Sequence, residues 1–342
     1  MNRRNALAVF ALALSAPALA GDHAPPVKSY QFGVVAKSQS NPVFIAARTG
    51  AMDAAKDLEK KHGVQIRINW QTPTNEDAQL QAQFIEQLAG LGVDGITVSC
   101  SDANVLTSAI DAAVAKGVTV VTFDSDAPRS RRMAYYGVND EECGRKLMQE
   151  LAKAMGDKGG KVAVLAGNQN APNLQLRVKG VRDEIEKLRD KGFTLKDVYY
   201  HKETAADAAA RVQQVQAADP EIAGWAMVGG WPLFTQNALD GVYDKAKIVA
   251  VDALTEQIKY VQAGQVQTLI VQDCYGWGYK TVEMLFNKAH LGEEPRRVIN
   301  TFELKTVTKD NASEYIDLWK KWLGEGDKKD APSPSAPKPA GK

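Results

Sequence analysis

The 342-residue sequence has few of the residues that build metal clusters and redox centres. It holds 4 histidines and 3 cysteines, and none of them has the spacing of a metal-binding knuckle. Lysine and arginine number 42 against 41 aspartates and glutamates, so the basic excess typical of nucleic-acid or anionic-membrane partners is missing. The composition therefore predicts no metal, no other cofactor and no nucleic-acid partner.

Common catalytic motifs are missing as well. There is no Gly-x-Ser-x-Gly elbow, no phosphate-binding loop and no Cys–His pair at a suitable spacing. Gly276 and Gly278 lack the third glycine of a dinucleotide-binding loop. Asp124 and Asp252 could form a carboxylate pair like that of glycosidases, but nothing else of such a site accompanies them. We therefore expect a binding protein and not an enzyme.

The cysteines leave two interpretations open. In an oxidising compartment Cys100, Cys143 and Cys274 would permit one disulfide and one free thiol. Because they are far apart in the sequence, the alternative is that all three are small buried apolar residues. The sequence favours the second interpretation.

Only the start of the chain carries a long uninterrupted apolar segment. Arg3 and Arg4 precede the apolar residues 6–14, and Ala18-Leu19-Ala20 has the small-x-small pattern that signal peptidase accepts. Such a run is too short to cross about 30 Å of hydrocarbon. We expect residues 1–20 to be a cleaved signal peptide and the protein to be released into the periplasm; an amphipathic helix is the alternative. Cleavage would leave 40 basic against 41 acidic residues.

From residue 30 the chain alternates short β-branched runs with amphipathic segments. Strands are expected at 32–36, 64–70, 96–98 and 118–123, and the rhythm restarts after Asn139 with strands at 162–165, 194–200, 225–228, 248–251 and 268–271. The length exceeds one ordinary core, and no flexible linker divides the two runs. The pattern predicts an α/β protein with two doubly wound parallel-sheet lobes. Residues 327–342 are proline-rich and are expected to be a disordered tail.

Polar side chains follow the expected strands where each one ends. Because ligands of parallel sheets bind beyond the carboxyl ends of the strands, these residues are candidates for a binding site. Carboxylates, amides and hydroxyls pair well with ligand hydroxyl groups. Helix capping is the alternative for any one of them, and it is favoured for Ser40 and Asp102. The set comprises Ser38, Gln39, Ser40, Asn41, Ser99, Asp124, Ser125, Asp126, Asn168, Gln169, Asn170, Asp252, Gln272 and Asp273.

Aromatic residues near the same strand ends could pack on the C–H face of a sugar ring. Phe44 begins an expected helix, while Trp231, Tyr275 and Trp277 lie just beyond strand ends. For each of them taken alone, a place in the core is the favoured interpretation. Gly229-Gly230 before Trp231 would allow a ligand to approach the backbone closely.

At these positions the sequence resembles the ribose-binding-type periplasmic sugar-binding proteins, which are related to the lactose-repressor core. The resemblance runs from Tyr30 to about Gly326 and is carried by four motifs. These are Ala36-Lys37-Ser38-Gln39-Ser40-Asn41-Pro42-Val43-Phe44, Val120-Val121-Thr122-Phe123-Asp124, Val249-Ala250-Val251-Asp252 and Val271-Gln272. Together the motifs are quite specific, although each alone is not.

The resemblance implies a type I periplasmic binding protein fold with a three-crossover hinge. Its lobes would be residues 30–138 plus 273–301 and residues 139–272 plus 302–326. The implied protein is a monomer that closes its cleft on a ligand and delivers it to an ABC permease in the inner membrane. The alternative is a sensor subunit that signals to a chemoreceptor or histidine kinase. A transcription regulator is disfavoured, because a signal peptide stands where a DNA-binding headpiece would be.

The implied ligand contacts depart from the family pattern. Ser125 and Gln175 stand where ribose binders carry arginines, and Ser99 stands where they carry asparagine. We expect a different or larger sugar, with Trp231 replacing a lost ring. Since no lysine or arginine stands at a matched contact, a small neutral carbohydrate or polyol is favoured. The full set of expected contacts is Ser38, Asn41, Phe44, Ser99, Asp124, Ser125, Gln175, Trp231, Asp252 and Gln272.

Overall fold

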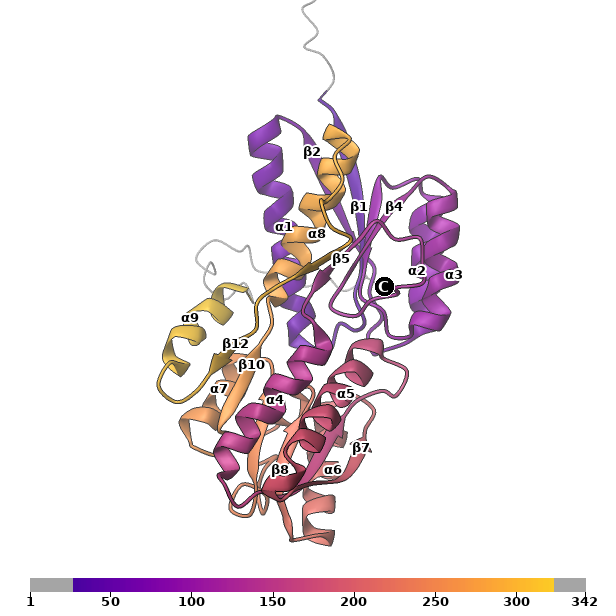
Figure 1. Cartoon of the computed structure of the whole chain (residues 1–342). Helices are drawn as coiled ribbons and strands as arrows, with labels where there is room; N and C mark the ends of the chain where they lie inside the picture. The colour runs from indigo at the N-terminus through magenta and orange to yellow at the C-terminus, as the bar shows by residue number, and fades with distance from the viewer. Residues whose placement is uncertain (1–26, 323–342) are drawn as a thin grey trace, which may run out of the picture.

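The computed structural model describes residues 27–322, which form two lobes (Figure 1). The expected signal peptide, residues 1–20, and the expected tail, residues 327–342, lie outside the described residues. The strands of the first lobe are β1 (Ser29–Val35), β2 (Gln65–Trp70), β3 (Gly95–Val98), β4 (Thr119–Phe123), β5 (Ala134–Gly137) and β11 (Ile299–Thr301). Those of the second are β6 (Gly160–Ala166), β7 (Phe193–Tyr200), β8 (Ile222–Met227), β9 (Lys247–Val251), β10 (Thr268–Val271) and β12 (Lys305–Val307).

The helices alternate with these strands along the chain. The first lobe holds α1 (Pro42–His62), α2 (Ala78–Gly90), α3 (Ala103–Ala115) and α8 (Cys274–Phe286). The second holds α4 (Asp140–Met155), α5 (Pro172–Lys187), α6 (Ala205–Ala218), α7 (Thr255–Gln262) and α9 (Ala312–Trp322). None of the helices between residues 27 and 322 combines the length and the apolar character that a membrane crossing requires.

Both lobes are built on the same sheet plan. The strand orders are β11-β5-β4-β3-β1-β2 and β12-β10-β9-β8-β6-β7, and all pairs are parallel except the antiparallel pair of β10 with β12. In the first lobe, separate buried clusters lie under α1 with α8 and under α2 with α3, so helices cover both faces of the sheet. The predicted fold class, two doubly wound parallel-sheet lobes, is confirmed.

Local sequence signals explain where the helices next to the sheets begin and end. Gly63 ends α1 in the left-handed conformation, at φ 66°, and Asp102 caps α3 by accepting from the backbone N–H groups of Asn104 and Val105. The sequence had suggested Ser40 as a helix cap, but Ser40 does not cap α1. Asn41 does so, because its Oδ1 accepts from the Val43 N–H at 3.3 Å.

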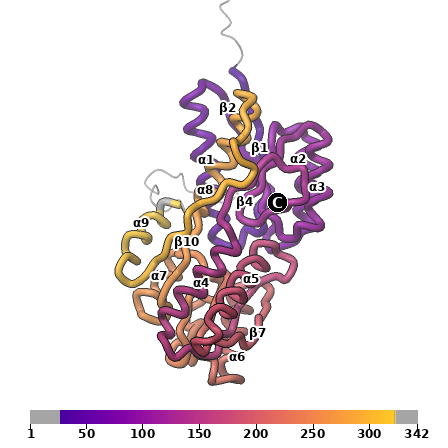
Figure 2. Tube along the Cα trace, viewed as in Figure 1, coloured from indigo at the N-terminus to yellow at the C-terminus, as the bar shows by residue number. Residues whose placement is uncertain are grey.

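The chain passes between the lobes three times, between β5 and α4, between β10 and α8, and between β11 and β12. The three connections lie side by side (Figure 2). The Phe302 N–H donates to the Gly137 carbonyl at 2.7 Å, and the Tyr136 hydroxyl donates to Asp273 Oδ2 at 2.7 Å. Three short adjacent connections of this kind can act together as one hinge.

Cys100, Cys143 and Cys274 are all buried, and no disulfide joins them. Each side chain is fully enclosed. The cysteines therefore act as small apolar residues in this structure.

Glycines let α1 and α8 approach until their backbones touch. A Cβ at Gly278 would lie 1.8 Å from the Ala47 carbonyl oxygen, and one at Gly50 would lie 2.0 Å from that of Tyr275.

We expect Gly278→Ala to lower the free energy of unfolding by about 1–3 kcal/mol, because the helices must separate. Gly90→Ala in α2 meets nothing within 4 Å and should be stabilising by up to about 1 kcal/mol. Urea denaturation of residues 21–342 measures both, and equal stabilities would contradict the close α1–α8 packing.

Candidate ligand-binding cleft

A cavity lies between the two lobes at the carboxyl ends of their strands. Its volume is about 30 Å³, close to the volume that one water molecule takes up, so a sugar could enter only if the lobes moved apart. Lys37, Asn41, Val43, Phe44, Glu76, Asp124 and Trp277 line it from the first lobe. Asn173, Leu174, Arg177, Glu203, Gly229, Trp231, Asp252 and Gln272 line it from the second. Any molecule held there would contact both lobes at once.

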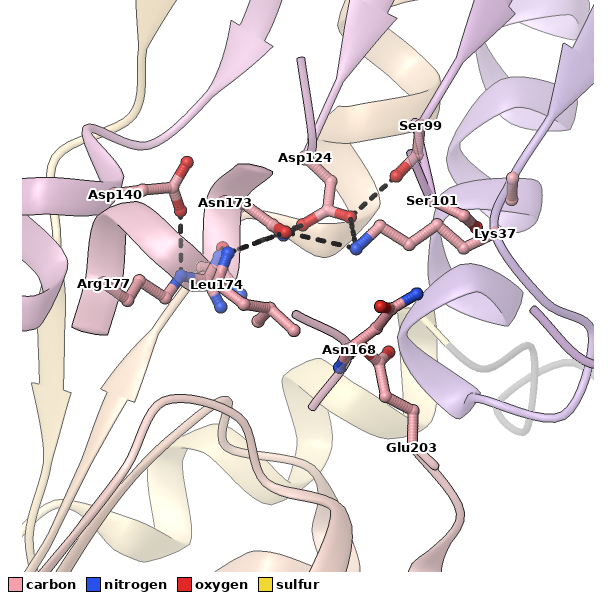
Figure 3. A network of polar contacts seen from close by, with 12 residues as sticks. Lys37, Ser99, Ser101, Asp124, Asp140, Asn168, Asn173, Leu174, Arg177 and Glu203 are labelled. Atoms are coloured by element: carbon pink, nitrogen blue, oxygen red, sulfur yellow. Dashed lines mark hydrogen bonds and ion pairs between the residues drawn. The ribbon is translucent and has the colours of Figure 1, made fainter. Parts of the chain in front are cut away.

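The Asp124 carboxylate is the meeting point of this cavity (Figure 3). From its own lobe, Ser99 Oγ donates to Oδ2 at 2.7 Å, and Lys37 Nζ lies 3.9 Å from the same oxygen. From α5 of the other lobe, Asn173 Nδ2 donates to Oδ1 at 3.1 Å, and Arg177 Nη2 lies 3.9 Å from Oδ1. One buried carboxylate therefore joins groups from both lobes.

Arg177 is held rigidly in the second lobe. Its Nε donates to Asp140 Oδ1 at 2.8 Å, its Nη1 to the Val228 carbonyl at 3.1 Å and its Nη2 to Gln272 Oε1 at 2.7 Å. Burial opposes the charge, but Asp140 and other nearby acids outweigh it and raise the pKa of Arg177. Burial likewise raises the pKa of Asp140 to about 7, against the opposing effect of Arg177. A guanidinium fixed at three donors is ready to recognise a ligand without losing side-chain freedom.

Asp252 occupies in the second lobe the place that Asp124 occupies in the first. Each follows the third strand of its sheet, β9 or β4. Both residues adopt the left-handed region, at φ 73° and 55°, which costs a non-glycine residue about 1–2 kcal/mol. Gln272 Nε2 donates to Asp252 Oδ1 at 2.8 Å, and burial raises the pKa of Asp252 to about 6 despite Arg177. Backbone strain of this kind clusters at functional sites.

Two glutamates from opposite lobes meet at one side of the cavity. Glu76 lies between β2 and α2, and Glu203 lies between β7 and α6. Their carboxyl groups are close enough for each to shift the pKa of the other. The Asn168 N–H donates to Glu203 Oε1 at 2.7 Å, and Figure 3 shows Glu203 reaching toward Asn168. Burial opposes the charge of nearby Lys37, but Glu76, Asp124 and Glu203 together raise its pKa.

Three aromatic side chains complete the wall. Phe44 and Trp277 come from the first lobe, with ring centroids 6.0 Å apart. Trp231 comes from the second lobe and meets the His201 ring edge-on at 5.0 Å. Among the described residues, the Nε1 donors of Trp231 and Trp277 have no hydrogen-bond partner. The wall thus offers apolar faces and two unused donors.

The ten residues predicted from the sequence fall into two groups. Those that line the cavity are Asn41, Phe44, Asp124, Trp231, Asp252 and Gln272. The other four do not line it: Ser99 instead orients Asp124, Ser38 and Ser125 are buried, and Gln175 Oε1 accepts from the Tyr200 hydroxyl at 3.5 Å. The strand-end rule therefore identified the central carboxylates better than the smaller side chains around them.

Sequence reasoning missed five charged or polar lining residues, namely Lys37, Glu76, Asn173, Arg177 and Glu203. Lys37 and Arg177 thus line the cavity, although the sequence had suggested no lysine or arginine at the ligand. Position in the sequence could have indicated Glu76 and Glu203, because residues 71–77 directly follow β2 and residues 201–204 directly follow β7.

The comparisons with known proteins agree with this geometry. A family model described as a periplasmic binding protein domain matches residues 32–294. The D-allose-binding periplasmic protein of Escherichia coli (strain K12) is 26% identical over 256 residues, covering 71% of this chain and 79% of that protein. The L-arabinose-binding periplasmic protein of the same organism is 25% identical, covering 92% and 98%.

Solved structures share the two-lobed fold. An ABC transporter solute-binding protein from Burkholderia graminis C4D1M, in complex with D-arabinose, superposes with a TM-score of 0.76 at 26% identity, covering 85% of this chain and 99% of that one. GanP, a glucose-galactose binding protein from Geobacillus stearothermophilus, gives a TM-score of 0.74 at 26% identity, covering 83% and 99%. Since the family model spans well over half of the sequence, the chain belongs to the periplasmic binding protein family.

Proposed function

We propose that the chain captures a neutral sugar or polyol in the interlobe cavity and delivers it to an ABC-type permease in the inner membrane. The observation that carries this proposal is the convergence of polar groups from both lobes on Asp124, in a cavity that the two lobes line together. The sugar-binding relatives and the signal-peptide pattern of residues 1–20 support the ligand class and the periplasmic location. The alternative of a sensor subunit has no comparable support.

The donors and acceptors of the cavity suit a hydroxyl-rich ligand. A hydroxyl group both donates and accepts, so it can lie between the Asp124 carboxylate and a donor such as Asn173 or Arg177. Asp252, bonded only to Gln272 and the thiol of Cys274 at 3.9 Å, has lone pairs left for a second hydroxyl. Trp231 and Trp277 add apolar faces for the ring carbons.

The balance of charge argues against anionic sugars. Glu76, Asp124, Glu203 and Asp252 line the cavity, against only two cations, Lys37 and Arg177. A phosphate or carboxylate on the ligand would add charge of the same sign as this excess. An uncharged ligand is therefore still favoured, because acidic side chains outnumber basic ones in the cavity and not because basic side chains are missing from it.

Ligand binding would couple to closure because the contacts are divided between the lobes. A ligand that binds one lobe gains the contacts of the other only when the hinge closes. A micromolar dissociation constant would correspond to about 8 kcal/mol. The permease would then recognise the closed monomer.

A panel of sugars should identify the ligand. We expect at least one of D-ribose, D-allose, L-arabinose, D-galactose and myo-inositol to raise the melting temperature of residues 21–342. Binding at 100 times the dissociation constant stabilises the native state by about 2.7 kcal/mol. Differential scanning fluorimetry provides the measurement, with D-ribose 5-phosphate as the control that should give no shift. Failure of every neutral sugar and polyol in a wider panel would contradict the proposal.

The two strand-end aspartates should both be required for tight binding. Asp124→Asn and Asp252→Asn keep the side-chain volume but remove a charge-assisted hydrogen bond, worth about 1.5–3 kcal/mol. Isothermal titration with the sugar found above should show affinity reduced by roughly 10- to 150-fold in each variant. Asp244→Asn, at an exposed position, is the matched control and should bind normally. Unchanged affinity in both cleft variants would remove these residues from the site.

A further inference from the structure

The Glu76–Glu203 pair stands between the enclosed cavity and the solvent. Both residues line the cavity. Both also line an open groove on the outside, together with Asn168, His201 and Arg211. Because Glu76 belongs to the first lobe and Glu203 to the second, this contact exists only while the lobes are together.

A hydrogen bond between the two side chains would require a proton. Their carboxyl groups lie close enough to shift each other's pKa, and Oε2 of each is buried without a hydrogen-bond partner among the described residues. Two ionised carboxylates only accept hydrogen bonds, so the two groups can bond to each other only when one of them is protonated. Without that proton, two like charges would face each other in a buried position.

The surrounding groups do not neutralise the pair. Lys37, in the connection between β1 and α1, is the one ammonium group that acts on both glutamates, and Asp124 adds a further negative charge beside Glu76. On the other side, His201 follows β7, and burial lowers its pKa to about 4, so it is uncharged near neutral pH. Lys202 and Arg211 lie on the outer groove. The described residues contain no group of three or more His, Cys, Asp or Glu side chains suited to a metal ion.

We propose that Glu76 and Glu203 form a proton-dependent latch, in which closure of the cleft takes up one proton that the two carboxyl groups share. The shared proton holds the lobes together over the ligand. This latch regulates the site described under the proposed function and in that respect rests on it.

The direction of the pH effect follows from the two states. In the open form the separated carboxyl groups keep ordinary pKa values near 4.3. In the closed form, burial and Glu203 hold the pKa of Glu76 well above its usual range. Burial would also raise the pKa of Glu203, but the Glu76 hydrogen bond, Lys37 and the Asn168 N–H together lower it. Between the open and closed pKa values of Glu76, closure weakens about tenfold for each unit of rising pH.

Two other carboxyl groups of the cleft also have raised pKa values, and their effect must be separated from that of the latch. Burial raises the pKa of Asp140 to about 7 and that of Asp252 to about 6. Both contact Arg177 or Gln272 of their own lobe, so their closest partners do not change when the cleft opens. Replacing Glu76 alone therefore isolates the contribution of the pair.

The test uses the distance between the lobes and needs no sugar. Cysteines introduced at Lys116 and Lys245, one exposed position in each lobe, carry spin labels; the native cysteines are all buried. Pulsed electron resonance then reports the closed fraction of residues 21–342 between pH 5 and pH 8. We expect that fraction to fall as the pH rises. Glu76→Gln should keep it nearly constant, because the Gln amide donates to Glu203 without a proton.

Further variants and a ligand arm complete the design. Glu203→Gln should reproduce the effect of Glu76→Gln, whereas Glu86→Gln at an exposed position should retain the original pH dependence. For a sugar that gives a thermal shift, titration in buffers of different ionisation heat should show about one proton taken up. Because the distance arm works without a ligand, failure to find a sugar leaves the latch testable.

Three results would overturn the latch. One is a closed fraction that does not change with pH in the original chain. A second is the same pH dependence in Glu76→Gln as in the original chain. The third is that D-glucosamine binds far more tightly than D-glucose and only when both glutamates are present, which would make the pair a site for a ligand ammonium group.

Discussion

The structure depends on a carboxylate that is buried where two lobes meet. An ionised group removed from water must be fully hydrogen-bonded, because an unpaired buried charge costs several kcal/mol. Asp124 accepts hydrogen bonds from Ser99 of its own lobe and Asn173 of the other, and the Lys37 and Arg177 cations lie 3.9 Å from it. The closed arrangement thus satisfies Asp124, and a ligand hydroxyl could replace any one of these partners. Ligand recognition and cleft closure therefore both follow from the need to give the buried Asp124 carboxylate polar partners.

The duplicated sheet plan explains why the site has two such aspartates. β4 and β9 occupy the same place in the two strand orders, and each is followed by an aspartate in the left-handed conformation. The hinge connections leave from neighbouring strands, so a rotation about them brings the two strand ends together or apart. The Glu76–Glu203 contact lies farther from the hinge, after the outermost strands β2 and β7. At that distance from the hinge it would be sensitive to small changes in opening.

The sequence predicted the two lobes because strands and helices alternate with clear periodicity, and it predicted Asp124 and Asp252 because both directly follow buried strands. It did not predict Arg177, because Gln175 was matched to the position where ribose binders carry an arginine. Two residues along a helix differ by about 200° in direction, so the neighbouring choice points away from the cavity. Lys37, Glu76 and Glu203 were missed because their contacts form between lobes, and no local pattern reveals such a pairing. Trp231 was found through its position after a strand end.

Closure driven by a bound sugar is the central claim, and small-angle X-ray scattering tests it most directly. The radius of gyration of residues 21–342 should be measured with and without the sugar that gives the largest thermal shift. The account predicts a smaller radius with the sugar, and no such change for Asp124→Asn at the same sugar concentration. A sugar that binds tightly while the radius stays constant would contradict it.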